Sequence, residues 1–369
     1  MDNNGYNNYN NYNNFNPNGF TNFTAPGDYR DQLEQAKKNE KKAIFVNASK
    51  LGGLLLLYNV FNSLFVNAFY IICYCLYHGG ISFNMKTVKT YLVEEQSELV
   101  TSSAFSMTAN LFVVVMSLAA LLIIAVCFMK IDIKSMLKPQ KGCVKQAVQW
   151  APLCVTLNLL VGIVIGIFVQ MMSQSGVTVP EADFTITKPS AYSVIIQFVY
   201  VCLIGPVVEE IVYRGLIIKL LSPFGNGVAI FFSALLFGLM HGNIPQAASA
   251  FAGALIYASV AVYCKSIVPT IIIHIINNVF ASLTDIGDAV GWSSASEFYL
   301  AIEIVMLFAG LYMMFVGLKA LIKNIRETEP ACALTVSRRN IAVLTNVFML
   351  IYLIMLICEF ISSFIRYNS

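Results

Sequence analysis

Long apolar stretches recur along most of the chain, and short polar or charged stretches separate them. Nine of these stretches approach or reach the ~20 residues that an α-helix needs to cross a bilayer. They cover residues 51–77, 103–129, 150–172, 191–221, 227–241, 246–264, 267–284, 298–321 and 341–364. The pattern predicts an all-α fold, a polytopic transmembrane helical bundle of about eight or nine spans.

The composition agrees with this membrane class. Of the 369 residues, 57% are hydrophobic and 12% are charged, and the mean hydropathy is +0.70. A water-soluble protein carries about a quarter charged residues, so a soluble enzyme is excluded and the lipid bilayer is the expected surroundings. The formal net charge is only +3, and we expect no nucleic-acid partner. None of the nine cysteines forms a Cys-x-x-Cys pair, and they fit small buried apolar residues.

The two ends of the apolar region differ from it in composition. Residues 1–27 are rich in Asn, Tyr and Gly without periodicity, which predicts a disordered tail. A charged juxtamembrane segment follows over 28–50, and its lysines suit an anionic inner leaflet. We therefore expect a multi-pass protein of the plasma membrane with a cytoplasmic N-terminus. The remainder divides into transmembrane helices over 51–189, a core over 190–285 and further transmembrane helices over 286–369.

Three ionisable residues, Glu209, Glu210 and Arg214, lie inside one apolar stretch. Charges at membrane depth are costly, so such a cluster is a functional-site hypothesis. On a helix Glu210 and Arg214 are four residues apart and share a face, where they neutralise each other. Glu209 is rotated by about 100° and has no basic residue at helical spacing, so its partner must come from another helix or be a water. A purely structural Glu-Arg pair explains the other two residues but leaves Glu209 without a task.

Two of the three histidines, His241 and His274, follow in later apolar stretches, and Asn278 lies one helical turn after His274. Glu209 and His241 are each sixteen residues from Gly225, so each lies about 24 Å above that turn. His274 rises only about 14 Å from the next inner turn, so helix tilt must absorb about 10 Å if the three share one site. An imidazole and a carboxamide on one face can hold a water, a metal or an oxyanion.

The residues at these positions resemble three motifs of a known family, the CPBP intramembrane proteases, also called the Abi or CAAX-protease family. The motifs stand in the family's order as Glu209-Glu210-Ile211-Val212-Tyr213-Arg214, Phe237-Gly238-Leu239-Met240-His241 and His274-Ile275-Ile276-Asn277-Asn278. One motif alone would be a weak signal, whereas three in order on successive spans are specific. The resemblance covers roughly residues 190–285 and identifies that range as a CPBP/Abi protease core.

The resemblance implies an intramembrane endopeptidase that hydrolyses a peptide bond in a short peptide or membrane-protein tail. It implies that Glu209 activates a water, that His241 and His274 complete the catalytic site, and that Asn278 stabilises the oxyanion, with Glu210 and Arg214 as supporting residues. The family has been described both as metal-dependent and as a metal-free glutamate-type enzyme. A zinc ion would use His241, His274 and Glu209 as ligands and keep one position for water.

Other functions stay open beside this one. Relatives act in CAAX trimming, bacteriocin processing or self-immunity, so the first alternative is a non-catalytic immunity or scaffold protein that keeps the family fold. The second is a proton-coupled transporter in which Glu209 and the histidines form a relay. A transporter is expected to show repeated halves with corresponding broken spans, and the sequence shows no such pair.

Overall fold

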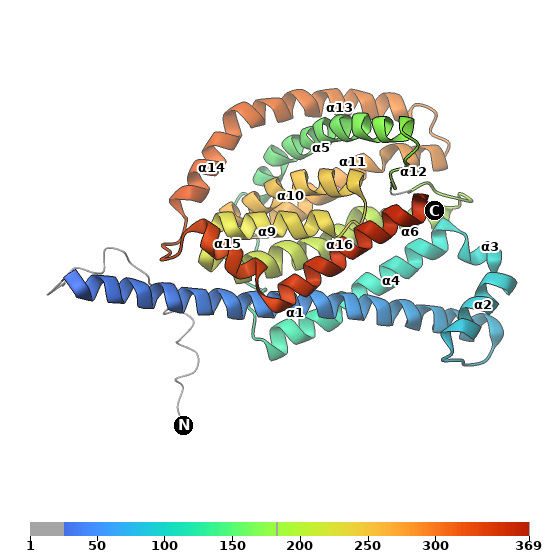
Figure 1. The fold of residues 1–369 in the computed structure, drawn as a ribbon. Helices are drawn as coiled ribbons and strands as arrows, with labels where there is room; N and C mark the ends of the chain where they lie inside the picture. Colours follow the sequence, from blue (N-terminus) through green and yellow to red (C-terminus); the bar gives the residue numbers. More distant parts are fainter. Residues whose placement is uncertain (1–25, 182–183, 369) are drawn as a thin grey trace.

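The computed structural model describes residues 26–181 and 184–368, which form helices joined by short loops and contain no β-strand (Figure 1). The tail predicted for residues 1–27 lies outside the described residues, apart from positions 26 and 27, which open the first helix. The helices are α1 (Pro26–His78), α2 (Met85–Glu95), α3 (Ser97–Val100), α4 (Ser103–Leu122), η3 (Ile123–Phe128), α5 (Cys143–Gln174), α6 (Ala191–Gln197), η4 (Phe198–Ile204), α7 (Gly205–Glu209), η5 (Glu210–Leu216), α8 (Ile217–Leu221), η6 (Ser222–Phe224), α9 (Asn226–Leu239), α10 (Ile244–Cys264), α11 (Val268–Ala281), α12 (Leu283–Ala289), α13 (Ala295–Tyr312), η7 (Met313–Gly317), α14 (Leu318–Glu327), α15 (Val336–Leu344) and α16 (Val347–Asn368).

The helix lengths confirm the predicted all-α transmembrane bundle. Within the described ranges, seven helices are long and apolar enough to cross a membrane, and the count becomes eight if α11 and α12, bent by 48°, form one span. The fifth expected span, 227–241, forms α9, whose 14 residues are fewer than a membrane crossing needs. Glycines with positive φ, Gly225 at +127° and Gly242 at +68°, lie close to its two ends. These backbone angles favour glycine and end a helix.

On the side of the bundle opposite α1, α5 packs among α10, α11 and α13 (Figure 1). The 53-residue α1 runs along one side of the bundle and contacts α4 and α16, while α13 and α14 arch over the opposite side. A glycine permits the α5–α13 contact, since a Cβ at Gly310 would lie 2.5 Å from the carbonyl oxygen of Pro152. Close approach at small residues is a usual way for membrane helices to pack.

One end of the bundle gathers the basic connection before α5. The Lys219 ammonium lies 2.9 Å from the Ser135 hydroxyl, and the Ser266 hydroxyl donates to the Lys138 carbonyl at 2.8 Å. The turn between α10 and α11 is therefore tied to the same loop that receives Lys219. These contacts fix the depth at which α11 starts, and hence the position of the histidine on it.

Candidate active site

The stretch that carries the two glutamates is not one regular α-helix. It changes from α6 to the π-helix η4, then to α7, to the π-helix η5 and to α8. The sequence analysis treated the stretch as a regular α-helix and missed both π-segments. Proline supplies the physical reason for the first one, because Pro206 has no N–H to donate in the ladder. Short π-segments inside α-helices frequently accompany functional sites.

The first π-segment leaves one carbonyl for another helix. The Gly205 N–H donates to the Tyr200 carbonyl five residues back, and Pro206 has no N–H for the Val201 carbonyl. The Asn278 side chain on α11 donates to that carbonyl through Nδ2 at 2.8 Å. Asn278 thus ties α11 to the deformed helix, a role that its proposed part in oxyanion binding did not anticipate.

Glu210 lies at the centre of a sealed ion-pair network. Its Oε1 is 3.0 Å from Arg214 Nη1 and 2.9 Å from His274 Nδ1, and the Glu210 and Arg214 side chains have no exposed surface. The Glu210–Arg214 pair predicted from the four-residue spacing is therefore confirmed. The contact with His274 was not predicted, and it joins the first and third motifs directly.

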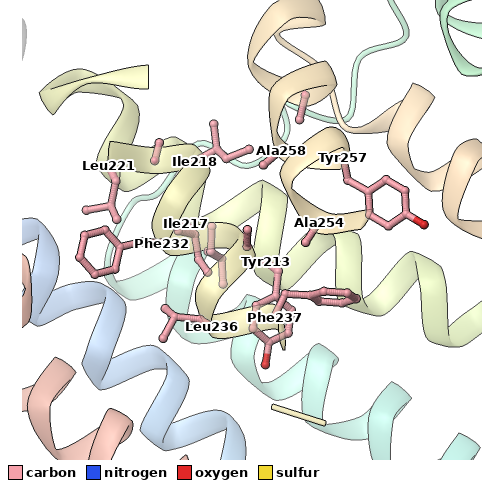
Figure 2. Close-up of a cluster of buried hydrophobic side chains, with 14 of the residues drawn as sticks. Tyr213, Ile217, Ile218, Leu221, Phe232, Leu236, Phe237, Ala254, Tyr257 and Ala258 are labelled. Atoms are coloured by element: carbon pink, nitrogen blue, oxygen red, sulfur yellow. The ribbon is translucent and has the colours of Figure 1, made fainter. Parts of the chain in front are cut away.

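The Arg214 guanidinium lies against aromatic rings. Its Cζ is 4.1 Å from the centroid of the Phe237 ring and 5.1 Å from that of Tyr257. No described residue accepts a well-directed hydrogen bond from its Nε or Nη atoms, so the rings and the Glu210 carboxylate are its surroundings. A desolvated cation over an aromatic face is stabilised by about 2 kcal/mol. Figure 2 shows Phe237 and Tyr257 in the buried cluster formed by η5, α8, α9 and α10.

Tyr257 is a site residue that the sequence analysis missed. Its ring stacks on His274 with a centroid distance of 5.1 Å and an interplanar angle of 26°. It belongs to none of the three motifs and lies on α10, so no local pattern distinguishes it from an ordinary buried aromatic residue. Tyr257 and Glu210 together fix the orientation of the His274 ring.

Glu209 has different surroundings from its neighbour Glu210. Its Oε2 is 3.6 Å from His274 Nε2, and 26% of its side chain is exposed. The predicted partner from another helix is therefore His274, and the packing of α11 removes the height difference of about 10 Å expected from ideal helices. Glu209 also lines a cavity of about 160 Å³ whose wall includes Tyr200, Tyr213 and Met240.

His241 lies at the edge of the Phe237 ring, on which the Arg214 guanidinium also rests. Its ring centroid is 5.0 Å from that of Phe237, and the His274 ring lies 5.6 Å from Phe237. His241 Nδ1 is 2.8 Å from the Phe237 carbonyl oxygen, to which it donates in the neutral tautomer with the proton on Nδ1. That tautomer leaves Nε2 as a proton acceptor. The structure thus brings all three motifs around Phe237, with His241 in contact with neither glutamate.

The zinc ligand set of His241, His274 and Glu209 does not form here. Among the described residues no group of three or more His, Cys, Asp and Glu side chains has a spacing that would hold a metal ion. Glu209 and His274 adjoin each other, but His274 Nδ1 is held by Glu210 and His241 contacts Phe237. A zinc site needs at least three protein ligands, and these three side chains do not form one group.

Comparison with known families supports the assignment made from the motifs. Residues 191–280 match the family model described as type II CAAX prenyl endopeptidase Rce1-like. No curated protein and no solved structure gives a significant match to the chain. The matched range runs from α6 to α11 and contains every motif residue, while α1, α4, α5, α13 and α16 lie outside it. The helices that form the Glu209–His274 site thus lie in the segment that is similar to this CAAX endopeptidase family.

Proposed function

We propose that this multi-pass membrane protein is an intramembrane endopeptidase that cleaves a peptide bond in a short peptide or membrane-protein tail. The observation that carries the proposal is the position of Glu209, which adjoins His274 on one side and lines a polar cavity on the other. Peptide hydrolysis at membrane depth needs both a base and a space for water. The charged residues 28–50, which form the first part of α1, support a cytoplasmic N-terminus and a plasma-membrane location.

The proposed reaction starts with a water molecule in the cavity. Glu209 takes one proton from it while the water oxygen attacks the peptide carbonyl carbon, which gives a tetrahedral oxyanion. His274 Nδ1 donates to Glu210, so the lone pair of Nε2 faces Glu209 Oε2 at 3.6 Å and stabilises the proton that Glu209 has taken. When the carbon–nitrogen bond breaks, this proton moves to the leaving amine. The products are a carboxylic acid and an amine, and the acid then gives its remaining proton to the amine or to water.

The other motif residues have roles in the same reaction. Glu210 and Arg214 hold His274 in its orientation, and Nε2 of His241 is free to accept a proton or bind a water at the other edge of Phe237. Asn278 uses one N–H for the Val201 carbonyl, and its second N–H is available to the oxyanion.

The experiment compares the wild type with Glu209→Gln in liposomes. The probes are a farnesylated peptide that ends in a Cys-aliphatic-aliphatic-X sequence and a library of lipid-anchored peptides with randomised residues, and mass spectrometry detects the products. Loss of a general base lowers the rate by about 10²–10⁴-fold. Glu303→Gln is the control, since this carboxylate on α13 accepts from the Tyr299 hydroxyl outside the site. Equal cleavage by Glu209→Gln and the wild type would disprove the catalytic assignment.

Two further arms separate the alternatives. A chelator added to the wild type tests the metal-dependent form of the reaction, because loss of cleavage that zinc restores would show a metal requirement. Absence of every product, together with peptide binding that Glu209→Gln leaves intact, would support the non-catalytic immunity or scaffold protein instead.

A further inference from the structure

The cavity beside Glu209 has a wall that the family-matched helices do not supply. Besides residues of the 191–280 range, it is lined by Tyr58, Asn59 and Asn62 of α1 and by Tyr352 and Glu359 of α16. The two helices that lie outside the motifs therefore reach the catalytic candidate. This inference rests on the proposed function, since it concerns what the proposed enzyme binds next to Glu209.

The size of the cavity limits what it holds. A volume of about 160 Å³ is enough for about five water molecules at ~30 Å³ each. Pockets that enclose a whole small ligand measure about 300–1,000 Å³. The cavity thus fits the end of one side chain beside the water that Glu209 needs, and a longer peptide must lie outside its mouth.

Two residues of the α1–α16 wall offer hydrogen-bond acceptors to the cavity, Asn62 and Glu359. Asn62 Oδ1 is buried and receives no hydrogen bond from the described residues. Glu359 has no ion-pair partner in the described part of the chain, although it lies in the middle of an apolar helix. A carboxylate at membrane depth is costly and usually pairs with a cation or faces a functional cavity. Glu359 is exposed, so it lies at the rim of the cavity rather than at its floor.

The packing of α1 against α16 places these two acceptors at one level. The Asn346 side chain at the start of α16 donates to the Ser49 hydroxyl at 2.7 Å and to the Phe45 carbonyl at 3.1 Å. Asn62 follows Ser49 by thirteen residues, and Glu359 follows Asn346 by thirteen residues. At ~1.5 Å per residue, both acceptors lie about 20 Å from the shared contact.

We propose that Glu359 and Asn62 form a subsite for a basic side chain of the peptide substrate, a lysine or an arginine close to the cleaved bond. An ammonium or guanidinium there pairs with the Glu359 carboxylate and donates to Asn62 Oδ1. The bound cation holds the peptide so that its carbonyl group is near the water beside Glu209. Selection of a basic residue is then a property of α1 and α16, and hydrolysis is a property of the family-matched helices.

The experiment uses the full chain in liposomes and two lipid-anchored peptides that differ only by lysine or norleucine at one position, with that position moved along the peptide in a series. For the wild type we expect one position at which the lysine peptide has a kcat/KM at least about ten-fold above that of the norleucine peptide. Glu359→Gln and Asn62→Leu should lower this ratio through KM. Glu359→Lys should abolish the lysine preference and should cleave a third peptide, with glutamate at that position, faster than the norleucine peptide. Glu303→Gln, which removes a carboxylate outside the cavity, should keep the wild-type ratio.

Each result bears on one proposal. Glu209-dependent cleavage without a basic preference at any position, or a preference that Glu359→Gln retains, would overturn the subsite and leave the peptidase intact. If no variant cleaves, the peptidase proposal fails, and equilibrium binding of the same two peptides to the wild type and Glu359→Gln still tests the subsite. Equal affinity of the wild type for lysine and norleucine at all positions would overturn it.

Discussion

Glu209 and Glu210 are neighbours in the chain, yet the two sides of the helix that they face differ in their charged partners and in their exposure. On the Glu210 side, Arg214 and His274 complete a charge network with no exposed carboxylate surface. On the other side, Glu209 keeps 26% of its side chain exposed and lines a cavity shared with α1 and α16. One side is closed and holds a fixed arrangement of charges, while the other has room for water.

The comparison explains how one histidine, His274, interacts with both glutamates. His274 Nδ1 is occupied by Glu210, and its Nε2 faces Glu209 at 3.6 Å. A carboxylate on one ring nitrogen fixes the tautomer and the orientation of the ring. The closed side therefore fixes the position of the nitrogen that faces the open side. This division predicts that changes on the closed side affect stability first and that changes on the open side affect activity first.

Removal of Arg214 should have the largest effect on stability. Arg214→Met leaves the buried Glu210 carboxylate without its cation, which costs about 3–5 kcal/mol of the free energy of unfolding. Unfolding by SDS in mixed micelles measures this loss. Arg338→Met is the matched control, because Arg338 is exposed, and Glu209→Gln should cost less than about 1 kcal/mol.

A double variant separates charge from packing on the closed side. Arg214→Met combined with Glu210→Gln removes both charges, so part of the stability lost in the single variant should return. If Arg214→Met unfolds at the same SDS concentration as the wild type, the buried network of Glu210, Arg214 and His274 does not stabilise the fold.

The wall that α1 and α16 supply to the cavity depends on a close contact between these two helices. A Cβ at Gly52 would lie 2.6 Å from Met349 N, whereas a Cβ at Gly53 would have no neighbour within 4 Å. Gly52→Ala therefore pushes α16 away from α1 and should cost about 1–3 kcal/mol, as overpacking does. Gly53→Ala is the adjacent control and should leave SDS unfolding unchanged. Equal behaviour of the two variants would mean that the α1–α16 wall is not held by this contact.

The sequence predicted those parts of the site that depend on local spacing. The Glu210–Arg214 pair followed from a separation of four residues, and the need for a partner of Glu209 on another helix followed from the rotation between adjacent positions. The choice of His274 as that partner depended on the depth and tilt of α11, which ideal helices placed about 10 Å too low. The fifth apolar stretch was counted as a span although it is short, and its helix α9 has 14 residues between Gly225 and Gly242.

Contacts that depend on long-range packing could not be predicted from the sequence. Tyr257 and Glu359 are a buried aromatic residue and a lone carboxylate in apolar helices, and neither has a local pattern that points to Glu209 or His274. The π-segment before Pro206 was missed for another reason. Proline inside a helix predicts a disturbance, but the form of the disturbance depends on which neighbour satisfies the freed carbonyl.

The smallest expected effect concerns the Val201 carbonyl, through which Asn278 connects α11 to the helix that carries Glu209. Asn278→Ala leaves the Val201 carbonyl without a donor, which should cost roughly 0.5–2 kcal/mol in SDS unfolding. Pro206→Ala restores an N–H five residues after Val201, within reach of a π-type bond. The double variant should therefore lose less stability than the sum of the two single variants. Simple additivity would show that Asn278 does not act through this carbonyl, and that α11 is held to the Glu209 helix by the Glu210–His274 contact instead.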